Sequence, residues 1–144
     1  MTVGDLIESR KEFYTIAEDV TVHEAARYLR ERQIRCVGVC GPDGRLLGVV
    51  SQSDISDKVA AENKCPAWMR VSEIMTSQLT VVPPETSLHD CVRLMEKHRF
   101  FHLPVMNQQG QYCGMISVRD ILTLIASDEK ARADMLESFL FPQR

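Results

Sequence analysis

The same seven-residue pattern occurs twice in this chain. It spans residues 48–54 as "GVVSQSD" and residues 114–120 as "GMISVRD", a shift of 66 positions. The same shift pairs identical residues well outside the pattern: His23 with His89, Arg27 with Arg93, Val39 with Val105, and Gly44 with Gly110. The repeat predicts two copies of one unit of about 60 residues, each too small to be comfortably stable without the other.

Each copy has the pattern of a strand, a helix, two strands and a second helix. The first helices are predicted from apolar residues spaced i, i+3, i+4, i+7: Val22, Ala25, Ala26 and Leu29, then Leu88, Cys91, Val92 and Met95. After each helix, two apolar runs separated by a glycine-bearing turn predict hairpins over residues 36–51 and 102–117. The stretches "YTIA" and "LTVV" predict the opening strands.

We therefore expect a mixed α/β fold of the α+β class, in which two sheets pack together with pseudo-two-fold symmetry. Two equivalent clefts would lie between the halves. The predicted organisation is a first repeat over residues 1–62, a linker over 63–70, a second repeat over 71–127, and a C-terminal helix over 128–144.

The C-terminal helix carries apolar residues on one side, namely Ala131, Met135 and Phe139, with Leu136 and Leu140 beside them. Such a helix either packs on its own chain or contacts another subunit. We favour a subunit contact in a homodimer, because the apolar end would otherwise stand exposed.

The composition indicates a cytoplasmic globular protein. Hydrophobic residues make up 44% and charged residues 26% of the chain, and the net charge of -3 argues against general affinity for nucleic acid or an anionic membrane. No apolar run approaches the roughly 20 residues that span a bilayer, and the N-terminus lacks the core of a signal peptide.

Metal binding and catalysis find no support in the sequence. The five cysteines include no C-x-x-C pair, and no histidine spacing completes a zinc site, so we expect small, reduced core residues and no metal. Motifs that pair a nucleophile with a base, such as G-x-S-x-G, are absent from the sequence. We expect no catalytic residues and no enzyme activity.

The repeated S-x-x-D sequence has two interpretations. Ser51 with Asp54, and Ser117 with Asp120, have the spacing of a helix-capping box at a strand-to-helix junction. A helix N-terminus is also a natural anion site, and an Asp presented there can accept hydrogen bonds from both hydroxyls of a ribose.

The whole pattern resembles a tandem pair of cystathionine-beta-synthase (CBS) domains, as found in stand-alone bacterial two-domain proteins. The resemblance covers residues 1–126 and rests on the two S-x-x-D sequences, on "HLPV" and "VSEIMT", and on "TVVPPETSLHDCVRLM". It implies a regulatory module that binds AMP, ADP, ATP, NAD(H) or S-adenosylmethionine between the repeats, and that dimerises.

The resemblance also implies ligand contacts residue by residue. Asp54 and Asp120 would hold ribose hydroxyls, with Ser51 and Ser117 beside ribose or phosphate and Arg119 on phosphate. The remaining contacts would be Thr15, Ile16, Arg35, Val37, Thr80, Val81, His102, Leu103 and Pro104. Arg35 and His102 have a simpler alternative, as a surface arginine and a core-edge histidine. We expect the second cleft to bind better, because the first has Ser53 in place of Arg119 and Gly38 in place of Pro104.

Two functional hypotheses follow, with a third that the net charge disfavours. The chain is either an adenine-nucleotide sensor that regulates a partner protein, or an interaction scaffold in which the S-x-x-D sequences only cap helices. The third hypothesis is nucleic-acid binding through Arg27, Arg30, Arg32 and Arg35.

Overall fold

The structure is a computed structural model that describes residues 1–127 and 129–141. Its helices are α1 (Val3–Glu8), α2 (Val22–Arg32), α3 (Gln52–Ile55), α4 (Leu88–His98), α5 (Val118–Ser127) and α6 (Glu129–Leu140). Its strands are β1 (Thr15–Ala17), β2 (Cys36–Cys40), β3 (Leu46–Ser51), β4 (His102–Met106) and β5 (Tyr112–Ser117). A π-helical turn (Ser56–Ala60) extends α3.

The strands form two small sheets, which confirms the mixed α/β fold. In the first sheet β1 runs parallel to β2, and β2 is antiparallel to β3; in the second, β4 is antiparallel to β5. Gly44 and Gly110 lie in the two hairpin turns with φ of 81° and 79°, a conformation that side chains rarely adopt. Both predicted hairpins are therefore confirmed.

The second opening strand is shorter than predicted. Residues 79–82 contribute one isolated parallel bridge, between Val82 and Val105, which matches the register of Ile16 with Val39 in the first repeat. The bridge stops there because Pro83 follows directly, and proline has no N–H to continue a ladder. The second sheet therefore has two strands where three were expected.

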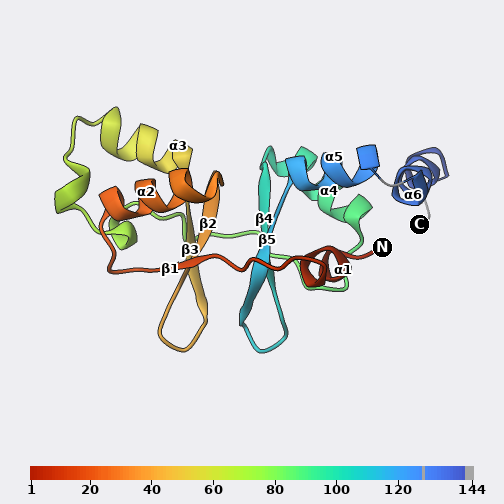
Figure 1. The fold of residues 1–144 in the computed structure, drawn as a ribbon, viewed down its shortest axis with the longest axis horizontal. Helices are drawn as coiled ribbons and strands as arrows, with labels where there is room; N and C mark the ends of the chain where they lie inside the picture. The colour runs from red at the N-terminus through yellow and green to blue at the C-terminus, as the bar shows by residue number, and fades with distance from the viewer. Residues whose placement is uncertain (128, 142–144) are drawn as a thin grey trace.

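The two hairpins stand side by side in the middle of the molecule, with α2 and α3 on one side and α4 and α5 on the other (Figure 1). The residues that precede each opening strand, 1–13 and 71–78, are called here the leading segments. Each leading segment packs into the core of the other repeat. Val3 is buried in the second core, whereas Val71 and Ile74 are buried in the first. The repeats are thus tied together by an exchange of segments.

Tyr112 of the second repeat packs against a hairpin strand of the first repeat, at the junction between the two. The Tyr112 ring lies so close to the Gly38 backbone that a Cβ atom there would stand 2.7 Å from ring carbons. Phe13 covers the same ring at a centroid distance of 5.5 Å. This contact explains why the first repeat has glycine where the second has Pro104.

The C-terminal helix α6 packs against α4 and α5 of its own chain (Figure 1). Ala131 is buried, and the Phe139 ring meets His89 of α4 edge-on at 4.5 Å between centroids. Leu136 and Leu140 remain exposed. The helix therefore makes an intrachain contact that we had not favoured, with a second apolar face left over. Residues 128 and 142–144 of the predicted helix lie outside the described residues.

Candidate ligand-binding site

Both S-x-x-D sequences form capping boxes. At α3, the Ser51 N–H donates to Asp54 Oδ2 (2.9 Å) and the Asp54 N–H donates to Ser51 Oγ (3.2 Å). At α5, the Ser117 N–H donates to Asp120 Oδ2 (2.8 Å) and the Asp120 N–H donates to Ser117 Oγ (3.1 Å). The capping interpretation is confirmed at both helices, and it uses only one oxygen of each carboxylate.

The second oxygen of Asp54 is also engaged. Asp54 Oδ1 pairs with Lys58 Nζ at 2.9 Å and accepts a hydrogen bond from Thr76 Oγ1 at 3.2 Å. Lys58 Nζ in turn donates to the Ile74 carbonyl at 2.8 Å. The Asp54 side chain is only 10% exposed. This carboxylate is closed in by its own helix and by the leading segment of the second repeat.

Asp120 is more open. Its Oδ2 pairs with Arg10 Nη2 at 2.7 Å, and the Arg10 Nη1 group donates to the Met115 carbonyl. No residue that the structure describes donates a hydrogen bond to Asp120 Oδ1, and the side chain is 38% exposed. Asp120 therefore keeps a free acceptor atom that Asp54 lacks.

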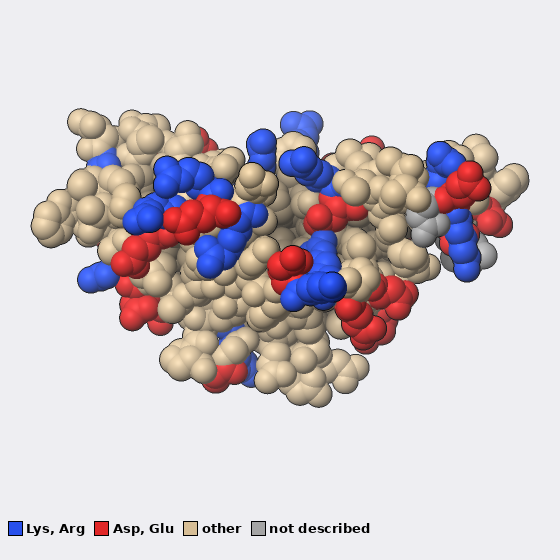
Figure 2. Space-filling model, in the orientation of Figure 1, with Lys and Arg blue, Asp and Glu red and all other residues tan. Residues whose placement is uncertain are grey.

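Asp120 and Arg35 both lie within electrostatic reach of His102. Burial lowers the pKa of His102, the Asp120 charge opposes that shift, and the Arg35 charge adds to it. Arg35 precedes β2 of the first repeat and His102 begins β4 of the second, so the two repeats contribute to one polar group. Figure 2 shows acidic and basic side chains along the line where the repeats meet on one face.

The remaining predicted residues divide by burial. Val37 and Leu103 are almost completely buried in the two cores, and Ile16 and Pro104 are buried as well. The partly exposed residues are Thr15, Thr80, Val81, Ser51 and Ser117, and the exposed ones are Arg35 and Arg119. Val37 and Leu103 therefore offer almost no exposed surface to a ligand.

Sequence reasoning missed three residues that contact the two carboxylates: Arg10, Lys58 and Thr76. The 66-residue shift contains a signal for them, because it aligns Arg10 with Thr76 and Lys58 with Leu124. The differences at these positions are the ones that distinguish the two sites. Lys58 lies one helical turn from Asp54, whereas the contacts of Arg10 and Thr76 follow from the exchange of leading segments, which no local pattern predicts.

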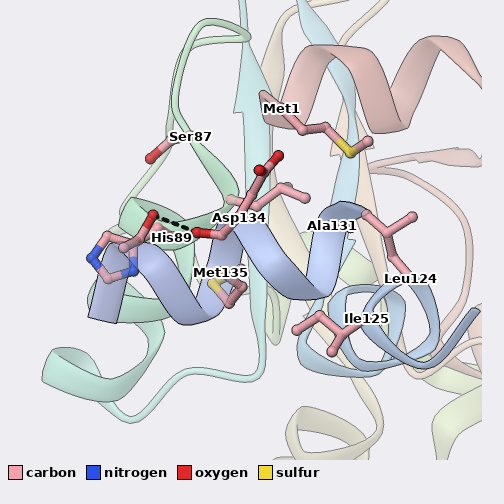
Figure 3. Close-up of a pocket in the computed structure, with 10 residues that line it drawn as sticks. Met1, Ser87, His89, Leu124, Ile125, Ala131, Asp134 and Met135 are labelled. Atoms are coloured by element: carbon pink, nitrogen blue, oxygen red, sulfur yellow. Dashed lines mark hydrogen bonds between the residues drawn. The ribbon is translucent and has the colours of Figure 1, made fainter. Parts of the chain in front are cut away.

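A small pocket of about 90 Å³ lies away from both carboxylates, between α4, α5, α6 and the N-terminus (Figure 3). Met1, Ala131 and Met135 line it beside His89 and Asp134. A second pocket, of about 160 Å³, is lined by Ala26, Leu29, Arg30, Gln52 and Ile55. Neither pocket is lined by a residue predicted to contact the ligand.

No helix of the described residues is both long enough and apolar enough to cross a bilayer. Within the same part of the chain, no three His, Cys, Asp or Glu side chains are grouped as metal ligands would be.

The family assignment rests on two matches along the chain. The CBS domain profile matches residues 3–61 and 71–127, so the chain belongs to the CBS-domain family as a tandem pair. A CBS-domain protein from Burkholderia ambifaria MC40-6 has the same fold, with 30% identity, a TM-score of 0.79, and coverage of 89% of this chain and 96% of that one.

Two similar structures contain adenosine compounds. The cytosolic domain of the Mg²⁺ channel MgtE, in complex with ATP, is 31% identical with a TM-score of 0.64, and the match covers 78% of this chain and 44% of that one. The CBS pair of protein MJ0100, with 5'-methylthioadenosine and S-adenosyl-L-methionine, shares the fold at 24% identity, a TM-score of 0.77, and coverage of 88% and 96%.

The chain matches only part of its curated relatives. It spans 64% of a 17.7 kDa protein of Acidianus ambivalens, at 28% identity over 75% of this chain. It spans 26% of the magnesium transporter MgtE of Thermus thermophilus, at 30% identity over 81% of this chain. The similarity concerns the CBS pair, and the transport activity belongs to a protein about four times longer than the match.

Proposed function

We propose that this CBS-domain pair is a non-catalytic regulatory module that binds an adenosine-containing ligand at Asp120. The observation that carries the proposal is the free Oδ1 atom of Asp120, held partly exposed at the N-terminus of α5. A carboxylate in this position can accept hydrogen bonds from a ribose diol. The ATP complex of the similar MgtE cytosolic domain supports this class of ligand.

The second repeat supplies most of the proposed contacts. Asp120 and Ser117 would face the ribose, and Arg119 would bind phosphate if it is present. The adenine would lie near Thr80, Val81 and Pro104. AMP, ADP and ATP are the first candidates, followed by NAD(H) and S-adenosylmethionine.

The first repeat has the equivalent residues Ser51 and Asp54, with Thr15 and Ile16 on the opening strand. A ribose at Asp54 would have to displace both Lys58 and Thr76. We therefore expect one ligand per chain, bound at Asp120.

Regulation follows from the position of the site. Asp120 belongs to the second repeat and its partner Arg10 to the leading segment of the first. A ligand that replaces this ion pair would favour one relative arrangement of the repeats over another, and so change the affinity for a partner protein that distinguishes them. We place the module in the cytoplasm as a homodimer, with α6 as a candidate contact.

The alternative is an interaction scaffold that binds no nucleotide. It is favoured by one observation, namely that both S-x-x-D sequences have a complete structural role as capping boxes. The two functions differ in their response to ligand.

Thermal unfolding with AMP, ADP, ATP, NAD, NADH and S-adenosylmethionine, and with GTP as a control, separates the two functions. Ligand at 100 times its dissociation constant adds about 2.7 kcal/mol, or roughly 5 to 11 °C for a chain of this size. We expect the shift to disappear in Asp120→Ala. Asp90→Ala is a matched control, because Asp90 follows Ser87 with the same S-x-x-D spacing at α4.

A shift that persists in Asp90→Ala and is lost in Asp120→Ala supports the sensor. If none of the adenosine compounds shifts the transition of the wild-type protein, the sensor is wrong and the scaffold stands.

A further inference from the structure

Arg10 is the ion-pair partner of Asp120 and can therefore affect which ligand binds there. Its Nη1 group donates a hydrogen bond to the Met115 carbonyl, and its Nη2 atom forms an ion pair with Asp120 Oδ2 without the geometry of a hydrogen bond. The side chain is 27% exposed and its Nη2 atom is buried. Among the residues that the structure describes, Asp120 is the one carboxylate within ion-pair distance of Arg10. The positive charge of Arg10 is thus balanced by a single acid.

The surroundings of this pair are basic. Arg35 acts on the neighbouring His102, and Arg119 directly precedes Asp120 in the chain. Neither arginine forms an ion pair with any of the described residues. Two further arginines are thus associated with this site, Arg35 through His102 and Arg119 through its place beside Asp120 in the chain. At the first site, Lys58 alone accompanies Asp54.

We propose that Arg10 makes the Asp120 site selective for a phosphate-bearing adenosine ligand, a conclusion that rests on the proposed function. A ribose has two adjacent hydroxyls: one can donate to the free Oδ1 atom of Asp120, and the other competes with Arg10 for Oδ2. The guanidinium released in this way is partly buried and has no other carboxylate of the described residues within ion-pair distance, so a new anion would stabilise it. A phosphate matches the forked donors of the guanidinium and restores the lost pairing.

A ligand without a phosphate restores that pairing less well. Adenosine carries no anion for Arg10, and S-adenosylmethionine carries one carboxylate together with a sulfonium and an ammonium group, which add positive charge to the site. A charge-assisted contact of this kind corresponds to a preference of about 10- to 100-fold for AMP over adenosine. Arg10 would thereby act as a specificity residue and Asp120 as the shared anchor.

Isothermal titration calorimetry with AMP, ATP, adenosine and S-adenosylmethionine tests the proposal. The variants are Arg10→Gln, which keeps a donor for Met115, and Arg10→Lys, which keeps the charge without the fork. Arg27→Gln is the matched control, since it removes one exposed arginine of an α2 ion pair and changes the net charge equally. Circular dichroism checks that each variant is folded.

We expect Arg10→Gln to weaken AMP binding at least about tenfold while adenosine binding stays constant or tightens, because Asp120 is released. Arg10→Lys should keep part of the preference for phosphate, and Arg27→Gln all of it. Equal affinity of the wild-type protein for AMP and adenosine overturns the proposal for Arg10 but leaves the proposed function standing. An equal loss for both ligands in Arg10→Gln also overturns it, as a structural effect. If no adenosine compound binds the wild-type protein, the proposed function fails as well.

Discussion

The two S-x-x-D sites have the same capping geometry and different carboxylates. Asp54 is 10% exposed, and both of its oxygens are engaged by protein groups. Asp120 is 38% exposed and has one free oxygen. The comparison shows that the repeated sequence determines the cap, whereas residues outside it determine whether the acid can bind a ligand.

Two substitutions between the repeats account for most of this difference. Position 58 is a lysine that reaches back to Asp54, and the equivalent position 124 is a leucine that cannot pair with Asp120. Thr76 and Arg10 occupy equivalent places in the exchanged leading segments, but one donates a neutral hydrogen bond and the other carries a charge.

The largest effect should come from removing the two acids in turn. Asp54→Ala leaves Lys58, Thr76 and the Ser51 N–H without their shared partner, and should lower the free energy of unfolding by about 2 to 3 kcal/mol. Asp120→Ala loses a cap and an accessible ion pair, and should cost about 1 kcal/mol. Urea denaturation without ligand measures both. Equal losses would contradict the distinction between a closed and an open site.

Much of the fold could be predicted from the periodicity and from the 66-residue shift. The helices at 22–32 and 88–98, both hairpins and both caps are encoded by residues close in sequence. The exchange of leading segments was not predictable in this way, because the contact of Arg10 with Asp120 joins residues more than a hundred positions apart. The same reason explains why Arg10 was missed as a site residue.

The next effect concerns the Gly38–Tyr112 contact, whose equivalent positions under the 66-residue shift are Pro104 and Leu46. Gly38→Ala places a methyl group 2.7 Å from the Tyr112 ring, and should cost about 2 kcal/mol of stability through overpacking. In a Tyr112→Leu background, which copies Leu46 of the first repeat, the same substitution should cost much less. A double-mutant cycle by urea denaturation measures the coupling. Strictly additive losses would show that the ring is not the obstacle.

Acidification should lower the free energy of unfolding by a smaller amount, through His102 of the second repeat. Burial lowers the pKa of His102 in the folded state, so the unfolded chain takes up the proton first. His102 therefore costs no stability above its ordinary pKa of about 6.5, and stability falls as the pH drops below that value toward the folded pKa. The first repeat has Cys36 at this position, which cannot take up a proton in this range.

Urea denaturation between pH 7.5 and pH 5 measures this dependence. His102→Gln should flatten it, and substitution of the exposed His23 by glutamine serves as the control. An unchanged pH profile in His102→Gln would assign the acid sensitivity to other groups.

The smallest effect is a change in the alkylation rate of Cys36, whose thiol interacts with Asp54 of the first repeat. Burial, with a contribution from Asp54, raises the pKa of Cys36 to about 12, whereas Cys65 is exposed in the linker, contrary to our expectation of core cysteines only. Pulsed alkylation at pH 8 with mass spectrometry should label Cys65 at least about 100-fold faster than Cys36. Because Asp54 holds the leading segment of the second repeat through Thr76, Asp54→Ala should accelerate labelling of Cys36, and Asp120→Ala should not. Equal acceleration in both variants would mean that the two carboxylates stabilise the same opening, and that the first site is no more closed than the second.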